Sequence, residues 1–190
     1  AIANLPSMTI GNLTINRTLG ANLCSNTTIN GTLTLTAGPL NIGANTLALN
    51  GPTIAGTPGN LIESGTSSMI FGGTSAGITI PNTITTLTNL TIGNTNGVGL
   101  TGALIINGAL TLESGLFTLG ANNITLSASA SIAGTPSSSA MVVADGAGQF
   151  FRTIAAGAGN YLFPVGDNSA GADYSPVTLS FSANSLGTRT

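Results

Sequence analysis

The composition of this chain of 190 residues leaves little material for catalysis or for nucleic-acid binding. Charged residues make up 4% of it, where a soluble globular domain has roughly 25%, and the net charge is -2 with no histidine and no lysine. Three arginines (Arg17, Arg152 and Arg189) cannot neutralise a run of phosphates, whereas 42% of apolar residues can fill a continuous core, so we expect a folded scaffold without a nucleic-acid partner.

The N-terminal part of the chain shows no targeting signal. Residues 1–7 lack a charged region followed by an apolar one, so we expect any export signal to have been removed. No apolar run approaches the roughly 18 residues of a transmembrane helix, so no transmembrane segment is expected. Cys24 is the only cysteine, which excludes an internal disulfide, and we expect its side chain to be a small buried hydrophobic group.

An internal duplication runs through most of the chain. The segments LTI at 13–15, NG at 30–31, LTL at 33–35 and GAN at 43–45 recur at 90–92, 107–108, 110–112 and 120–122, always with the same 77-residue offset. After one inserted residue, IAGTP at 54–58 returns at 132–136. Such agreement indicates a repeat protein, with one copy at about 13–89 and a second from residue 90 to 140 and onward.

Each copy also contains a shorter, 20-residue period, since LTI at 13–15 precedes LTL at 33–35 and LTI at 90–92 precedes LTL at 110–112. Apolar and polar residues alternate at 32–36, 46–49, 78–80 and 104–107, as in half-buried strands, and good helix formers are scarce. These features predict an all-β fold, a parallel β-solenoid or β-helix with coils of about 20 residues stacked roughly 4.8 Å apart. Dividing the length by the period gives nine to ten coils and about four turns in each 77-residue copy.

Glycine follows asparagine at four expected corners of these coils. We expect the glycines there to adopt positive φ angles without strain. The pairs are Asn30-Gly31, Asn50-Gly51, Asn96-Gly97 and Asn107-Gly108.

The composition changes after Ala140, because six of the eight aromatic residues follow it. We therefore predict a β-solenoid over residues 1–140 and an aromatic-containing β module over 141–190. This module is expected to be a partial β-sandwich-like unit or a cap over the last coil. Residues 177–182 read as a strand without a visible partner, which suggests that the module is incomplete.

Several runs resemble the repetitive cell-surface adhesins of Bacteroidota. They are LTIGNTNGVGLTGALIINGALTLESGLFTLGANNITLS at 90–127, SAMVVADG at 139–146, YLFPVGD at 161–167 and YSPVTLSF at 174–181. The resemblance implies a large protein exported by the type IX secretion system, in some members serving gliding motility. In that family the FPVG segment leads into a complete β-sandwich-like module, whereas this sequence stops at Thr190 and contains no C-terminal sorting domain of the family's kind.

Two patterns could in principle hold a cofactor or a metal. Residues 97–102, GVGLTG, match a dinucleotide-binding fingerprint, but that pattern has meaning only before a helix, and a strand is expected here. Asp167 and Asp173, with Asn168, are the only calcium candidates. Their spacing lacks the alternating ligands and terminal glutamate of a calcium loop, so solvated turn carboxylates are the preferred interpretation. We therefore expect no cofactor and no metal.

No catalytic group emerges from the remaining residues. Glu63 and Glu113 are the only glutamates, and they stand at non-equivalent points of the two copies, so a glycosidase-like pair is not expected. Serine, threonine and Cys24 lack a histidine or lysine base, and a metal site lacks imidazole and a second thiolate. The sequence thus predicts a protein that is not an enzyme, with a carbohydrate-active β-helix enzyme as the alternative that polysaccharide cleavage would reveal.

The function that we expect is a stiff, non-enzymatic stalk segment of a large secreted or cell-surface adhesin. Its partners would be neighbouring modules of the same chain or like subunits, and surface polysaccharide or another substratum. A self-assembling extracellular filament subunit and an ice-binding solenoid are alternatives. Threonine alternates at 32–36, TLTLT, as on ice-binding faces, but the second copy reads ALTLE at 109–113, which is a poor template for ice.

Overall fold

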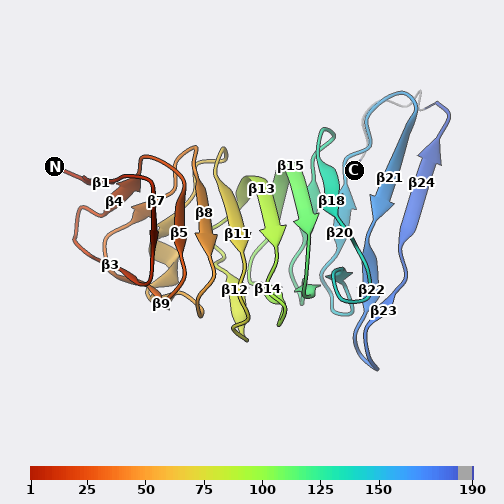
Figure 1. The fold of residues 1–190 in the computed structure, drawn as a ribbon. Helices are drawn as coiled ribbons and strands as arrows, with labels where there is room; N and C mark the ends of the chain where they lie inside the picture. The colour runs from red at the N-terminus through yellow and green to blue at the C-terminus, as the bar shows by residue number, and fades with distance from the viewer. Residues whose placement is uncertain (184–189) are drawn as a thin grey trace.

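Short parallel strands stack along one axis from the N-terminal end to the C-terminal end of a computed structural model (Figure 1). The structure describes residues 1–183 and 190, and Arg189 lies outside them. Strands make up 48% of the described residues and helix 2%, and coils of about 20 residues form a β-solenoid of about 8 turns. The predicted all-β solenoid is confirmed. Nine to ten coils is too many, because the last part of the chain folds into antiparallel strands.

Each turn offers three strand places, and the same place in successive turns forms a parallel sheet. The first place holds β1 (Ala3–Leu5), β4 (Ala21–Leu23), β7 (Leu40–Asn41) and β10 (Leu61–Ile62). The second begins with β2 (Met8–Ile10), β5 (Thr27–Ile29), β8 (Thr46–Leu49) and β11 (Ser68–Phe71), and the third with β3 (Leu13–Asn16), β6 (Leu33–Ala37) and β9 (Ala55–Gly56). A short 3-10 helix, Pro58–Asn60, follows β9.

In the middle of the stack, β13 (Thr86–Ile92) and β15 (Leu104–Leu112) are long because each runs through a corner and fills two places. The first part of β15 pairs with β17 (Ile124–Leu126), and its last part pairs with β18 (Ser131–Gly134). In the later turns the strands that follow the second place form a separate parallel sheet: β12 (Ile78–Ile80), β14 (Val98–Leu100), β16 (Phe117–Thr118), β19 (Val142–Val143) and β22 (Val165–Asp167). We number this sheet as the third place of those turns.

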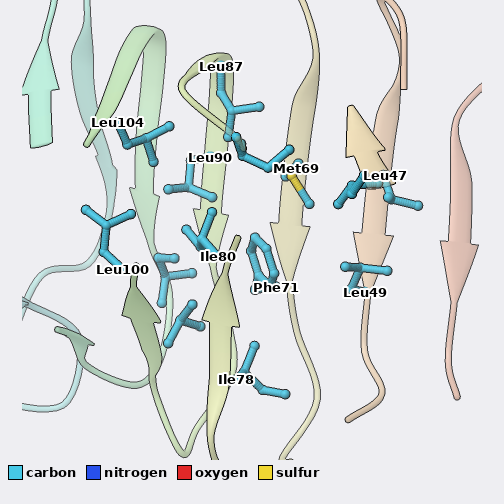
Figure 2. Close-up of a cluster of buried hydrophobic side chains, with 14 of the residues drawn as sticks. Leu47, Leu49, Met69, Phe71, Ile78, Ile80, Leu87, Leu90, Leu100 and Leu104 are labelled. Carbon is cyan, nitrogen blue, oxygen red and sulfur yellow. The ribbon is translucent and has the colours of Figure 1, made fainter. Parts of the chain in front are cut away.

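The core is a column of aliphatic side chains that stack in register from turn to turn. In the second place, Leu47 pairs with Met69, Met69 with Leu90 and Leu90 with Leu110, and all four are buried. Figure 2 shows Leu47, Met69 and Leu90 side by side in the interior, with Phe71 and Ile80 nearby. Each such side chain contributes roughly 1.5–3 kcal/mol of burial before its entropy loss. The period-two alternation in the sequence therefore places leucine and isoleucine inside.

The 20-residue period is confirmed by the strand register. Leu13 pairs with Leu33, and Leu90 pairs with Leu110. However, the first pair lies in the third place of the turn and the second pair in the second place. The 77-residue offset therefore spans three turns and two further strands, and not the four turns expected. The second copy is rotated by one strand place about the solenoid axis.

Glycine is required at most of the Asn-Gly corners for a reason other than φ. Of the four corner glycines, only Gly97 has a positive φ, of 81°. At Gly51 an added Cβ would lie 1.8 Å from the carbonyl oxygen of Gly31, and at Gly108 it would lie 2.6 Å from Oδ1 of Asn89. The stacked turns thus approach so closely at these corners that no side chain fits.

The parallel stack continues beyond Ala140, the boundary suggested by the composition. β17 pairs in parallel with β20 (Phe150–Arg152), and β19 pairs in parallel with β22. Antiparallel pairing appears only where β21 (Gly159–Phe163) meets β24 (Val177–Phe181), and where β22 meets β23 (Asp173–Tyr174), among the strands that the structure describes. β24 is the strand expected at 177–182, and it has a partner, β21. The pair lies at the C-terminal end of the stack (Figure 1).

Two neighbouring isoleucines of β15 allow the contribution of a core side chain to stability to be compared with that of a surface side chain. Ile106 is fully buried, whereas the side chain of Ile105 is 44% exposed. We expect Ile106→Ala to lower the free energy of unfolding by about 2–5 kcal/mol because it leaves a cavity. The same change at Ile105 should cost less than about 1 kcal/mol. Urea unfolding of both variants measures the difference, and equal losses would contradict the assigned sides of the strand.

The corner glycines Gly11 and Gly51 provide a matched pair for the close-approach argument. An added Cβ would meet nothing within 4 Å at Gly11, which belongs to the first turn, but would collide with the Gly31 carbonyl at Gly51. We expect Gly51→Ala to lower the free energy of unfolding by about 1–3 kcal/mol, and Gly11→Ala to leave it unchanged or slightly higher. Thermal unfolding tests this, and a tolerated Gly51→Ala would refute the close approach.

Candidate functional site

The outer surface of the second strand place carries a straight row of small or aliphatic uncharged residues. Each residue pairs in register with the next across neighbouring strands, so the row follows the solenoid axis. Its members are Thr9, Thr28, Ala48, Ile70, Thr91, Thr111 and Ala133, of which only Ala48 is buried. The row offers hydroxyl and methyl groups but no charge, so its contacts with a partner would be polar or hydrophobic and individually weak.

Asparagines form ladders that hold neighbouring turns together. The Asn41 Nδ2 donates to the Asn22 Oδ1 over 2.8 Å, and the Asn22 Nδ2 donates to the Asn4 Oδ1 over 3.5 Å. That ladder lies on strands β1, β4 and β7, and at a corner of the coil the Asn50 Nδ2 donates to the Asn30 Oδ1 over 2.8 Å. Because these side-chain amides bond to one another, the ladders stabilise the stacked turns. They leave fewer amide groups free to bind a partner.

The glycine-rich pattern at 97–102 does not build a dinucleotide site. Val98, Gly99 and Leu100 form strand β14, and the pattern leads into β15 rather than into a helix. Among the described residues the only helix is the short 3-10 segment Pro58–Asn60. The helix N-terminus that would bind a pyrophosphate in this motif is therefore missing from this segment.

The structure brings the two calcium candidates together. Asp167 and Asp173 pair directly across the antiparallel strands β22 and β23, and both are exposed. The Asp167 Oδ1 accepts hydrogen bonds from the backbone N–H of Ser169 over 2.5 Å and from its hydroxyl over 2.7 Å, and these bonds hold the pKa of Asp167 below its ordinary value of 3.8. Among the described residues, no group of three or more metal-binding side chains gathers here or elsewhere. The pair therefore shapes a turn.

Glu63 and Glu113 follow strands in different places of the turn, β10 and β15. The Glu63 Oε1 accepts a hydrogen bond from the Thr85 hydroxyl over 3.0 Å, and its Oε2 accepts one from the backbone N–H of Gly65. Glu113 is exposed at a corner two turns further along. The fold thus gives Glu63 a role in joining two turns and does not pair it with Glu113.

Arg152 is a structural residue that the sequence alone did not reveal. It is only 8% exposed, and its guanidinium donates from Nη1 to the Leu162 carbonyl oxygen over 2.9 Å and from Nη2 to the Ala130 carbonyl oxygen over 2.8 Å. It also lies 5.4 Å from the centre of the Tyr161 ring. Burial lowers the pKa of Arg152. These contacts fasten β21 to the preceding turn, so Arg152 holds the antiparallel end in place.

The fold defines a β-solenoid repeat protein. The chain matches no protein-family model, no curated protein and no solved structure. Across the described residues, no helix has the length and apolarity needed to cross a membrane.

Cys24 is exposed, which overturns the expectation of a buried thiol. Leu23 points into the core, so the next residue points outward at the corner after β4. We therefore expect one thiol per chain to react with Ellman's reagent in native buffer, with no further reaction after denaturation. Cys24→Ser should give no signal. A thiol that reacts only in denaturant would show that Cys24 is covered.

Proposed function

We propose that this chain is a non-enzymatic structural segment of a large secreted or cell-surface adhesin, where it acts as a stiff stalk. The observation that carries the proposal is the continuous core, because one cluster of buried side chains extends from Ile15 to Val142 without a break. A stack of about 8 turns, at roughly 4.8 Å for each, gives a rod of about 40 Å. Tandem copies would lengthen such a rod without new packing rules.

The surface composition supports a role in weak, multivalent contact outside the cell. The outward positions carry mostly threonine, serine and asparagine, and charged residues are 4% of the chain. Such a surface lacks the charge for strong ionic binding, so affinity would come from many repeated contacts. Surface polysaccharide, another substratum and neighbouring modules are the partners that this chemistry suits.

Ice binding is a second candidate, favoured by the threonines in the straight row on the second strand place. Four of the seven positions in this row are threonine, and the others are Ala48, Ile70 and Ala133. The rotation of the second copy argues against ice binding, because it divides the threonines between two sides of the solenoid. Thr14 and Thr34 lie in the third place of the turn, and their counterparts Thr91 and Thr111 lie in the second. Thermal hysteresis of the purified protein would support this candidate, and its absence would remove it.

A filament subunit is the remaining alternative, and the partly exposed apolar side chains of the N-terminal turn favour it. The inward residues Leu5, Met8, Ile10 and Leu13 are only partly buried there, whereas their counterparts in later turns are buried. Either a further turn or a second copy would cover them.

The decisive experiment is the intact mass of the native protein, combined with antibody labelling of unpermeabilised cells of the source organism. We expect a mass far above the 18.6 kDa of this chain, and labelling of the cell surface or the medium, because a stalk joins other modules. A native mass equal to that of this chain would favour the filament subunit instead. Labelling confined to permeabilised cells would overturn the cell-surface proposal.

A further inference from the structure

A polar hollow of about 470 Å³ opens on the third strand place, in the middle of the solenoid. Its walls come from three neighbouring strands and one loop: Thr79 of β12, Gly99 of β14, Thr118 of β16 and Asn168 of the turn between β22 and β23. Segments from three successive turns and from the antiparallel end therefore meet at one place. A hollow assembled in this way is fixed by the fold and not by a single loop.

The hollow exists because a side chain is missing at Gly99. Thr79, Gly99 and Thr118 pair in register on adjacent strands, so Gly99 interrupts a row of outward threonines. An added Cβ at Gly99 would come no closer than 3.5 Å to another atom, the Thr79 Cγ2, and its φ is not positive. By contrast, Gly97 has a φ of 81° and lies against the Leu116 carbonyl. Packing explains Gly97 but does not explain Gly99, and glycine inside a strand often marks close approach of a ligand.

Three polar side chains around the hollow are free to bind, whereas the side-chain amide of Asn96 already donates to the Thr74 carbonyl oxygen. The hydroxyls of Thr79 and Thr118 and the side-chain amide of Asn168 make no hydrogen bond to another described residue. The asparagines of the ladders, such as Asn22 and Asn41, are instead bonded to each other. Hydroxyl and amide groups are thus presented around the hollow, and the partly exposed Leu116 adds an aliphatic surface.

The charges near the hollow select among ligands. None of the lining residues is charged, and Asn168 follows Asp167, which pairs with Asp173. Two carboxylates close to one wall disfavour an anionic ligand. A ligand that suits this site is neutral, rich in hydroxyl groups and able to lay C–H groups on a small aliphatic surface.

From this chemistry, we propose that the hollow at Gly99 binds a segment of a neutral polysaccharide. Hydroxyls of a sugar unit would enter the space left by the missing side chain and bond to Thr79, Thr118 and Asn168. The proposal deepens the adhesin function, on which it rests, because it names one contact site on the stalk. The stalk itself does not depend on this site.

The test uses the full chain labelled with ¹⁵N, titrated with the neutral hexasaccharides of β-1,4-glucose, α-1,4-glucose and β-1,4-mannose, and with hexagalacturonate as an anionic comparison. We expect at least one neutral probe to shift the amide signals of Thr79, Gly99 and Thr118, with a smaller effect from hexagalacturonate. No shift at millimolar concentration with any neutral probe would overturn the proposal. An equal or larger effect from hexagalacturonate would overturn the preference for a neutral ligand.

Gly99→Thr fills the hollow and continues the threonine row, so the fold should accept it. We expect this variant to unfold at or above the wild-type temperature and to lose at least tenfold in affinity. The matched control is Ile105→Thr, at an exposed position of β15 that pairs with Thr86 and Thr125 and so also continues a threonine row, and this variant should bind like the wild type.

If Gly99→Thr fails to fold, Asn168→Ala, in an exposed turn, provides the second measurement and should weaken binding several-fold. Unchanged affinity in a folded Gly99→Thr would place the binding elsewhere and overturn the proposed site. A native mass far above 18.6 kDa would still support the stalk in that case, so the two failures are distinguishable.

Discussion

In-register stacking of each turn on the one before is the constraint on which the rest of this structure depends. Equivalent residues of successive turns lie one strand spacing apart, as with Leu47, Met69, Leu90 and Leu110. This spacing favours apolar side chains inside, because a buried polar group needs a hydrogen-bond partner within its own turn. Thr27, a buried inward residue that pairs with Leu47, has such a partner, since its hydroxyl donates to the Ser25 carbonyl oxygen over 3.3 Å. The same spacing leaves no room for a side chain at corners such as Gly51. Composition, corner chemistry and core thus follow from one repeated contact.

The rotated duplication follows from the same contact. All three strand places use the same apolar-polar-apolar pattern, so a strand that fits one place also fits another. A duplicated segment fits as long as each of its strands falls on one of the three strand places. The 77-residue offset meets this condition while it moves each strand by one place. The core accepts this shift, but a row of outward residues does not continue from the first copy into the second. Equivalent outward residues such as Thr34 and Thr111 face different sides of the solenoid. Repetition of this kind extends a rod more readily than it builds one flat binding face.

Much of the fold could be predicted because the length of one coil, about 20 residues, is also the spacing of the repeated segments in the sequence. The pairs Leu13 with Leu33 and Leu90 with Leu110 follow directly from the 20-residue spacing. Features that depend on geometry at a corner could not be predicted. The positive φ expected at Gly31, Gly51 and Gly108 is absent, because close approach of backbone and not torsion selects glycine there. Cys24 was wrongly expected inside, since one residue of uncertainty at a strand end reverses the side that it faces.

The candidate site could not be predicted from the sequence for a related reason. In a chain with 27 glycines, Gly99 stands out only when its neighbours across the sheet, Thr79 and Thr118, are known. Those neighbours lie one full turn away in the sequence on either side, and the strand places had to be counted before the row could be traced. The core fixes the inward positions, so outward positions other than the asparagine ladders and the glycine corners can vary at a smaller cost in stability. In such a solenoid, a binding site is most readily made by an outward residue that departs from its row, and Gly99 is such a departure.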